Sequence, residues 1–303
     1  MLHTHLRVGA SLVAEKGFVF TQALLQRLAE TECTGLAGVP SHFQILLRRS
    51  SFCRMSLPSL RYLQQAGGHL APVFVRELRA AFPKTEMFIM YGQTEATARL
   101  SYLSPEKADR KPGSVGSAIP GVTLHIVDSE GRALPPGEVG EIVAEGPNIC
   151  QGYWEAEEET RTYFRQGKLH TGDLGTFDAE GDITILDRAK SILKCGGKRI
   201  SCRQIEETLL EFDEIAEAAV IGMPDETLGE AVKAFVAPRN WRAEGLEERL
   251  LAFCRSHLAS VFVPREIVCL RELPKSNTGK ILKEELKKLP APSPSCAVAA
   301  SSA

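Results

Sequence analysis

The chain has 303 residues, of which 38 are acidic and 36 are basic, so its formal net charge is only −2. A chain of this length can bury a sizeable core and has room for two domains. The near balance of charge gives no electrostatic basis for binding nucleic acid or an anionic membrane surface, so we expect neither as a partner. We also expect no membrane span, because no apolar run approaches the roughly eighteen residues that a span requires.

Eight cysteines are scattered along the chain, with no Cys-x-x-Cys pair and no His/Cys cluster at zinc spacing. A chain of this size does not need disulfides to hold its fold. The start of the chain also lacks a basic segment followed by an apolar one, the pattern of a secretory leader. We therefore expect a reducing, cytoplasmic setting.

The first 110 or so residues alternate between strand and helix patterns. A short buried strand with its turn is predicted at 9–18, a helix running into a strand at 21–40, and a helix followed by a strand at 74–92. Apolar strands alternating with helices are typical of a mostly parallel sheet covered on both faces. The expected fold class of this part is α/β.

After residue 121 the predicted elements are short strands, at 122–128, 140–146 and 180–188. The segment between the first two is rich in Gly and Pro, which is turn chemistry. This pattern suits an antiparallel sheet or a small β-barrel-like section.

The remainder mixes helices and strands in an order typical of a small α+β domain. The elements expected there are a helix at 203–212, strands at 216–224 and 231–238, a helix at 246–259 and a strand at 265–270. The tail is mainly Pro, Ser and Ala, so we expect it to be disordered. The predicted organisation is a partial large domain at 1–187, a small mobile domain at 188–289 and a tail at 290–303.

The stretch MYGQTEATARL places Gly92, Gln93, Thr94 and Glu95 directly after a predicted apolar strand. Ligands of open α/β sheets bind at this carboxyl edge. A hydroxyl can donate to a phosphate oxygen, and a glutamate can hold a magnesium ion that bridges phosphates. A glycine turn that begins a helix explains the same residues about equally well, so the motif alone leaves both interpretations open.

Two shorter motifs are also ambiguous by themselves. In QQAGGHLAP, Gly67 and Gly68 follow an apolar strand and offer bare backbone that a planar base could approach, or they form an ordinary turn. In LHTGDLG, Asp173 could accept both hydroxyls of a ribose, although an Asp after a Gly most often marks a turn.

Basic residues crowd two further segments. LDRAKSILKCGGKRIS surrounds Gly196 and Gly197 with cations at the junction between the two predicted domains, and a solvated linker is the ordinary interpretation. LPKSNTGKILKEEL places Lys280 after Gly279, but it lacks the first glycine of a Walker phosphate loop, and a Lys-rich helix explains it as well.

Taken together, the order and spacing of these segments resemble the adenylate-forming superfamily of AMP-dependent synthetases and ligases, and most of all its acyl-CoA synthetases. The segments are AGGHLAP, MYGQTE, GYW with Thr160, HTGDL, DRAKSILKCGGKRIS and PKSNTGK. The resemblance implies ATP-dependent activation of a fatty or other hydrophobic carboxylic acid through an acyl-adenylate, followed by thioester formation with coenzyme A. It also implies ATP, Mg²⁺ and coenzyme A as cofactors.

The resemblance further implies roles for individual residues. Thr94 would contact the nucleotide phosphate, Glu95 would hold magnesium, and Lys280 would reach the carboxylate and the α-phosphate, where a fixed cation offsets developing charge. The nucleotide would be bound by Gly67, Gly68, Tyr91, Gly92, Gln93, Thr94, Asp173 and Arg188. In that set Tyr91 would stack on the adenine and Asp173 would bind the ribose hydroxyls.

By the same resemblance, the small domain rotates about a hinge at Lys190 after the first half-reaction. Lys194, Gly196 and Gly197 would then border the tunnel for the thiol. The superfamily's Ser/Thr/Gly-rich phosphate loop is expected well upstream of LRVGASLV, so the resemblance predicts an N-terminally truncated member. Two alternatives are an adenylation domain that serves a carrier protein, and a non-catalytic remnant or binding module.

Overall fold

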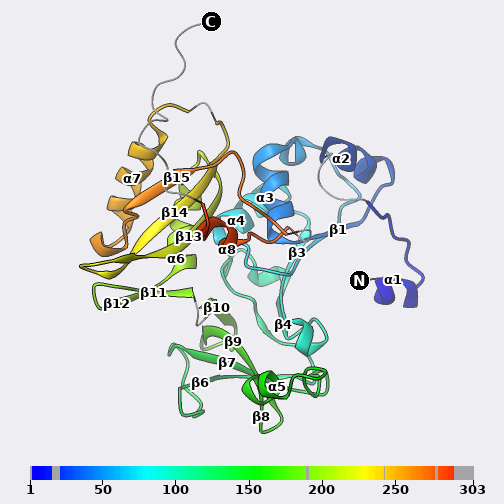
Figure 1. The fold of residues 1–303 in the computed structure, drawn as a ribbon. Coiled ribbons are helices and arrows are strands. Elements are labelled where there is room, and N and C mark those ends of the chain that lie inside the picture. The colour runs from blue at the N-terminus through cyan, green and yellow to red at the C-terminus, as the bar shows by residue number, and fades with distance from the viewer. Residues whose placement is uncertain (1, 16–20, 189–190, 242, 277–278, 290–303) are drawn as a thin grey trace, which may run out of the picture.

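The computed structural model describes residues 2–15, 21–188, 191–241, 243–276 and 279–289. The predicted hinge residue Lys190 and the tail at 290–303 lie outside the described residues. Three sheets follow one another along the chain, and Figure 1 shows the third beside the helices of the first, with the second below both.

The first sheet confirms the predicted α/β layer. Its strand order is β1-β2-β3-β4-β5, with the first three strands parallel and the last two antiparallel. The strands are β1 (Gly35–Gly38), β2 (Tyr62–Gln65), β3 (Glu86–Tyr91), β4 (Ser101–Leu103) and β5 (Ser117–Ala118). The parallel strands need crossover connections, and helices supply them.

Among the described residues, four α-helices precede β3: α1 (Leu2–Arg7), α2 (Thr21–Glu30), α3 (Pro40–Arg49) and α4 (Pro72–Ala81). Each of α3 and α4 begins with proline, which is favoured in the first helical turn because its missing N–H is not needed there. Helix α3 buries Phe43 and Leu46, and α4 buries Phe74 and Leu78, a spacing that puts one apolar face towards the core.

The strand predicted at 9–18 is wrong. In its described part, residues 10–15 have no regular structure and are exposed. No described strand pairs with them, and an isolated extended segment in water has no partners for its backbone groups.

The second sheet is antiparallel, with strand order β10-β9-β7-β6 and β8 paired to β9. Its strands are β6 (Thr123–Val127), β7 (Gly140–Glu145), β8 (Phe164–Arg165), β9 (Lys168–Phe177) and β10 (Ile183–Arg188), with helix α5 (Glu157–Tyr163) before β8. Among the described strands β6 does not pair with β10, so the barrel-like section is an open sheet.

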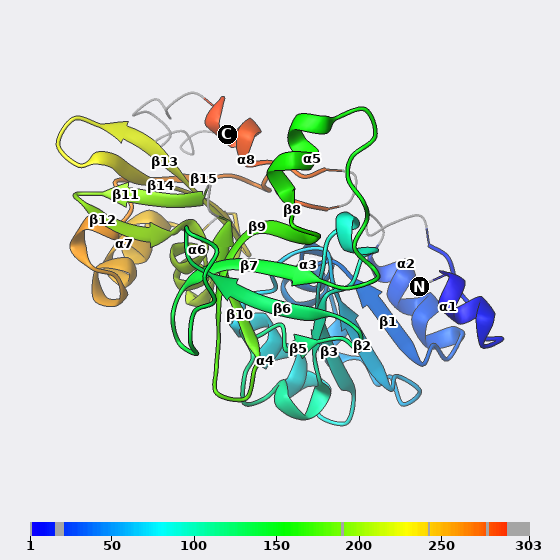
Figure 2. The same ribbon diagram turned by 90° about the horizontal axis from the view of Figure 1, so that it is seen from below.

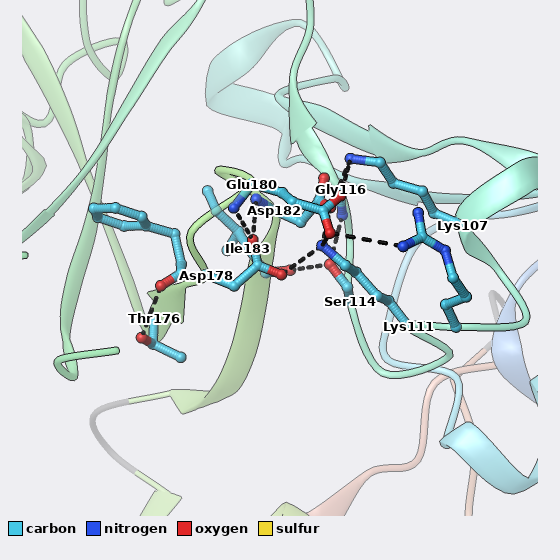
Figure 3. Close-up of polar contacts among 11 residues, drawn as sticks. Lys107, Lys111, Ser114, Gly116, Thr176, Asp178, Glu180, Asp182 and Ile183 are labelled. Atoms are coloured by element: carbon cyan, nitrogen blue, oxygen red, sulfur yellow. Dashed lines mark hydrogen bonds and ion pairs between the residues drawn. The ribbon is translucent and has the colours of Figure 1, made fainter. Parts of the chain in front are cut away.

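A cluster of charges joins this second sheet to the first layer (Figure 3). In the loop between β9 and β10, Asp178, Glu180 and Asp182 surround the ammonium group of Lys111, at 2.6, 3.2 and 2.6 Å. Lys107 donates to the same Asp182 at 2.7 Å. Because Asp182 is buried, the two lysines hold the hairpin against the segment that leads to β5.

The third sheet belongs to the predicted small α+β domain. Its order is β12-β11-β14-β13, and β15 pairs parallel to β14. The elements are β11 (Ile192–Cys195), β12 (Lys198–Ser201), α6 (Cys202–Glu211), β13 (Ile215–Asp225), β14 (Gly229–Pro238), α7 (Leu246–His257), β15 (Glu266–Cys269) and α8 (Lys283–Lys287). Helix α6 and strand β13 contact α4 and α3, so the small domain packs on the first layer. Figure 2 shows the same arrangement from below. None of the described helices is long and apolar enough to cross a membrane.

Candidate active site

The motif that follows β3 forms a tight loop at the carboxyl edge of the parallel strands. A Cβ on Gly92 would lie 2.5 Å from the carbonyl oxygen of Ala98, so only glycine fits without moving the backbone. Thr97 and Ala98 adopt positive φ angles of 50° and 70°, a conformation that costs about 1 kcal/mol or more for residues with a side chain. Such strain is concentrated at functional sites, where the surrounding structure maintains it.

The same loop presents the two residues predicted to handle phosphate and metal. Thr94 and Glu95 lie in a short 3₁₀ turn, Thr94–Ala96, with Thr94 exposed. The Oε1 atom of Glu95 accepts a hydrogen bond from the Tyr153 hydroxyl at 2.6 Å. Burial of Tyr153 and the adjacent Glu95 raise the pKa of this phenol, so it stays protonated and donates.

Sequence reasoning did not single out Tyr153, although its GYW motif was noted. The backbone N–H of Tyr153 donates to the Thr160 hydroxyl at 2.9 Å, and that hydroxyl donates to the carbonyl of Ala156 at 2.8 Å. Thr160, in the middle of α5, thus fixes the segment that holds Glu95. The spacing between GYW and Thr160 was the signal in the sequence.

Asp173 lies within β9, so the ordinary turn interpretation does not apply. The pairing of β9 with β7 shifts register between His170 and Leu174, and Gly172 there has a φ of 71°. This bulge lets Asp173 accept a hydrogen bond from the Tyr91 hydroxyl at 2.8 Å. Arg188 on β10 lies opposite Asp173 on β9, and its guanidinium lies 3.3 Å from the second carboxylate oxygen of Asp173.

These contacts determine the charge state of the tyrosine. Burial and the negative charge of Asp173 raise the pKa of Tyr91, so its hydroxyl remains a donor. Asp173 is itself buried, whereas the side chain of Arg188 is 60% exposed. Three of the residues predicted to bind the nucleotide therefore meet at one point, between the first and second sheets.

The glycine turn after β2 lies beside the loop that carries Lys280. A Cβ on Gly67 would lie 3.2 Å from Val39, and a Cβ on Gly279 would lie 3.3 Å from the same side chain. A Cβ on Gly68 would lie 3.3 Å from Pro40, the first residue of α3. The exposed Lys280 of the small domain is thus brought next to a turn of the large one.

The structure does not connect the remaining predicted site residues with this edge. Lys194 lies on β11, and Gly196 and Gly197 form the turn to β12, with φ angles of 55° and 75°. All three are exposed. Among the described contacts, no hydrogen bond or ion pair joins them to Tyr91 or Asp173.

Glu95 fits a magnesium ion only as part of a composite site. The described residues contain no group of three or more His, Cys, Asp or Glu side chains that could hold a metal. Mg²⁺ is commonly bound by one or two carboxylates together with substrate phosphates and water. A single carboxylate beside the exposed Thr94 hydroxyl suits that arrangement.

Comparison with known protein families identifies the class. Residues 1–154 match the model of the AMP-binding enzymes, and residues 204–280 match the model of the AMP-binding enzyme C-terminal domain. The chain therefore belongs to the AMP-binding enzyme family, the adenylate-forming superfamily that the motifs indicated.

The relatives include several CoA ligases. The chain is 33% identical over 264 residues to the long-chain-fatty-acid–CoA ligase of Salmonella typhimurium, covering 87% of this chain and 46% of the relative. It is 39% identical over 233 residues to the 2-succinylbenzoate–CoA ligase of Bacillus cereus, covering 77% and 47%. The chain thus spans about half the length of these curated relatives.

Solved structures of the superfamily share the fold. The crystal structure of the anthranilate CoA ligase AuaEII in complex with anthranoyl-AMP superimposes with a TM-score of 0.84 and 29% sequence identity. The match covers 92% of this chain and 54% of that one.

Proposed function

We propose that the chain serves ATP-dependent activation of a carboxylic acid through an acyl-adenylate, followed by thioester formation with coenzyme A. A fatty or other hydrophobic acid is the proposed substrate class. The proposed boundary between the large and small domains lies at residues 187 and 188, near the end of β10. Residues 188–289 would then move as one unit about Lys190.

One observation carries the proposal. Val39 lies beside both the glycine turn at Gly67 and the loop at Gly279, so the loop that carries Lys280 lies against the carboxyl edge of the first sheet. A carboxylate that attacks the α-phosphate brings two anions together, and a fixed cation lowers the energy of the charge that develops between them. Lys280 is the cation we assign to this step.

The other residues would bind and orient the nucleotide. Asp173 offers a carboxylate to the ribose hydroxyls, with Tyr91 and Arg188 fixing its orientation at 2.8 and 3.3 Å. Thr94 would donate to a phosphate oxygen. Glu95 would contribute one carboxylate ligand to a magnesium ion, which would neutralise phosphate charge when bound.

The exposed hairpin at Lys194 to Gly197 is the part of the small domain that we assign to the second half-reaction. None of the described hydrogen bonds or ion pairs joins this hairpin to the Tyr91–Asp173 contact, and we assign it a separate role after domain rotation. The setting we propose for the chain is reducing and cytoplasmic, where the seven described cysteines, all free thiols in this structure, would stay reduced.

Carboxylate-dependent exchange of labelled pyrophosphate into ATP tests the proposal. The assay uses the 303-residue chain with Mg²⁺ and a panel of long-chain fatty and aromatic acids. Lys280→Met should reduce exchange by at least about a hundredfold, the effect typical of removing one preorganised charge-stabilising group. Lys287→Met is the matched control, because its side chain is 51% exposed and, among the described contacts, pairs only with Glu284 on the same helix.

Thioester formation is measured separately. Lys194→Met should leave pyrophosphate exchange intact and slow the appearance of acyl-CoA. No exchange with any acid, in a folded chain that binds AMP, would contradict catalysis by this chain and favour the binding-module alternative. Exchange without acyl transfer to coenzyme A would favour a carrier protein as the acceptor.

A further inference from the structure

A buried carboxylate connects the large domain to the loop that carries Lys280. Glu217 lies on β13 of the small domain, and its side chain is only 3% exposed. Its Oε1 atom lies 3.2 Å from the guanidinium of Arg49, at the end of α3 in the large domain. A charge this deeply buried is tolerated only when it is paired.

The other oxygen of Glu217 contacts the lysine loop. Its Oε2 atom lies 2.6 Å from the ammonium group of Lys275 and accepts a hydrogen bond from the backbone N–H of Leu273 at 3.4 Å. Lys275 forms an isolated β-bridge with Ile281, the residue after Lys280. One carboxylate therefore pairs with a cation of each domain, and the second cation lies at the base of the catalytic loop.

We propose that Glu217 is a positioning residue that couples docking of the small domain on α3 to the placement of the Lys280 loop. When Arg49 lies beside Oε1, the two groups form an ion pair without a hydrogen bond to Oε1, and Lys275 is held by Oε2. When the small domain moves away, Glu217 loses one of its two cations. The contact thus favours the pose in which Gly279 lies against the large domain.

Other polar contacts between side chains cross the same interface but do not reach the loop. They are Arg48–Asp213 at 3.3 Å, His69–Glu207 at 2.5 Å and Arg76–Glu211 at 2.9 Å. In the last pair both side chains are about half exposed, so it contributes little. Among the described ion pairs across this interface, only Arg49–Glu217 shares a carboxylate with a residue of the loop.

The docked pose can be measured without catalysis. An ideal Cβ on Gly279 lies 3.7 Å from the Cβ of Ser41, close to the mean of about 3.8 Å for a disulfide. In the Ser41→Cys, Gly279→Cys double variant, the rate of disulfide formation under mild oxidation reports how often the loop is docked. Peptide mass mapping separates this crosslink from reactions of the native thiols.

The proposal predicts a specific pattern of rates in that background. Glu217→Gln should slow crosslinking by roughly tenfold, as expected for removing one charge from a desolvated, paired group. Arg49→Gln and Lys275→Gln should each slow it as well. Adding Lys275→Gln to Glu217→Gln should have little further effect, because both act through one carboxylate. Adding Arg49→Gln should slow it somewhat further, because Arg49 also donates a hydrogen bond to the backbone carbonyl of Arg271 at 3.2 Å. Arg76→Gln, in the exposed pair across the same interface, is the control and should change the rate less than twofold.

Two results would overturn the proposal. If Lys275→Gln slows crosslinking but Arg49→Gln does not, Glu217 only stabilises the loop within its own domain. If the parent pair does not crosslink at all, although the Gly279→Cys single variant folds despite the φ of 82° at that position, the docked pose is not populated and there is nothing for Glu217 to position. Glu217→Asp, which keeps the charge, should recover part of the rate, whereas a purely steric role would give no such recovery.

The inference relies on the proposed function only for the role of Lys280. Crosslinking needs neither ATP nor an acid, so it can succeed when pyrophosphate exchange fails. In that case the domain contact would stand and the proposed activity would not.

Discussion

Replacing Asp173 by Asn tests the proposed ribose site most directly. The change keeps the size of the side chain and one acceptor oxygen for the Tyr91 hydroxyl, while removing the negative charge. Arg188 loses its partner at small cost, because its side chain is 60% exposed and water can solvate it. The fold should therefore tolerate Asp173→Asn, and the effect should fall on nucleotide binding.

The magnitude follows from the type of hydrogen bond that is lost. A hydrogen bond to a charged group contributes about 1.5–3 kcal/mol, and 1.4 kcal/mol corresponds to about a factor of ten in affinity. Because Asp173 is buried beside Tyr91, solvent screens this contribution little. The dissociation constant for AMP should rise roughly ten- to a hundredfold.

Isothermal titration calorimetry with AMP and with 2′,3′-dideoxy-AMP provides the assay. The parent should prefer AMP, and Asp173→Asn should lose most of that preference. Asp109→Asn is the control, because its side chain is 62% exposed and pairs with Arg79 away from the site. Equal weakening for both nucleotides would refute the ribose assignment, since a general loss of structure does not distinguish the hydroxyls.

Three further predictions concern the site and its support. Gly92→Ala should lower the free energy of unfolding by about 1–3 kcal/mol in urea titrations, because the added methyl meets backbone 2.5 Å away, whereas Gly113→Ala, with its nearest contact at 3.4 Å, should cost less. At pH 8, iodoacetamide should alkylate the exposed Cys150 much faster than Cys202, because burial raises the pKa of Cys202 to about 12. Lowering the pH should weaken the ion pairs of Lys107 and Lys111 with Asp182 and so reduce the stability of the fold, which far-UV circular dichroism measures during an acid titration.

The acid prediction follows from the direction of the pKa shifts. Burial opposes ionisation of Asp182, but hydrogen bonds from Lys107 and Lys111 outweigh it and lower its pKa. A lowered carboxyl pKa contributes stability that is present above the unfolded value of about 4 and is lost as the pH falls through the folded value. In the Asp182→Asn variant, stability should therefore fall less steeply as the pH is lowered. The same steepness as in the parent would contradict this account.

Equal rates of alkylation at the two cysteines would contradict the cysteine prediction. If Cys150 and Cys202 are alkylated at the same rate in the folded chain, the burial of Cys202 is not maintained in solution. For glycine, a Gly92→Ala variant as stable as Gly113→Ala would show that the loop after β3 relaxes without cost.

Local pattern predicted most of the elements. The alternation of helix and strand over residues 21–92 gave the parallel layer, and the apolar runs at 216–238 gave the hairpin of β13 and β14. The strand expected at 9–18 failed, because an apolar stretch shows that burial is favourable but not whether a partner is available. Asp173 illustrates the same limit, since its Gly-Asp pair is typical of a turn and yet lies in a bulge of a ten-residue strand.

The sequence by itself determined the superfamily, the order of the motifs and the residue types able to bind a nucleotide. Only the tertiary structure decided which of them meet. Tyr91 and Asp173 are 82 positions apart, and Tyr153 and Glu95 are 58 apart. Gly279 reaches Ser41 only because the small domain docks on α3, with Glu217 between the two domains. Such contacts depend on sheet pairing and domain packing, and the periodicity of a short segment carries no information about either.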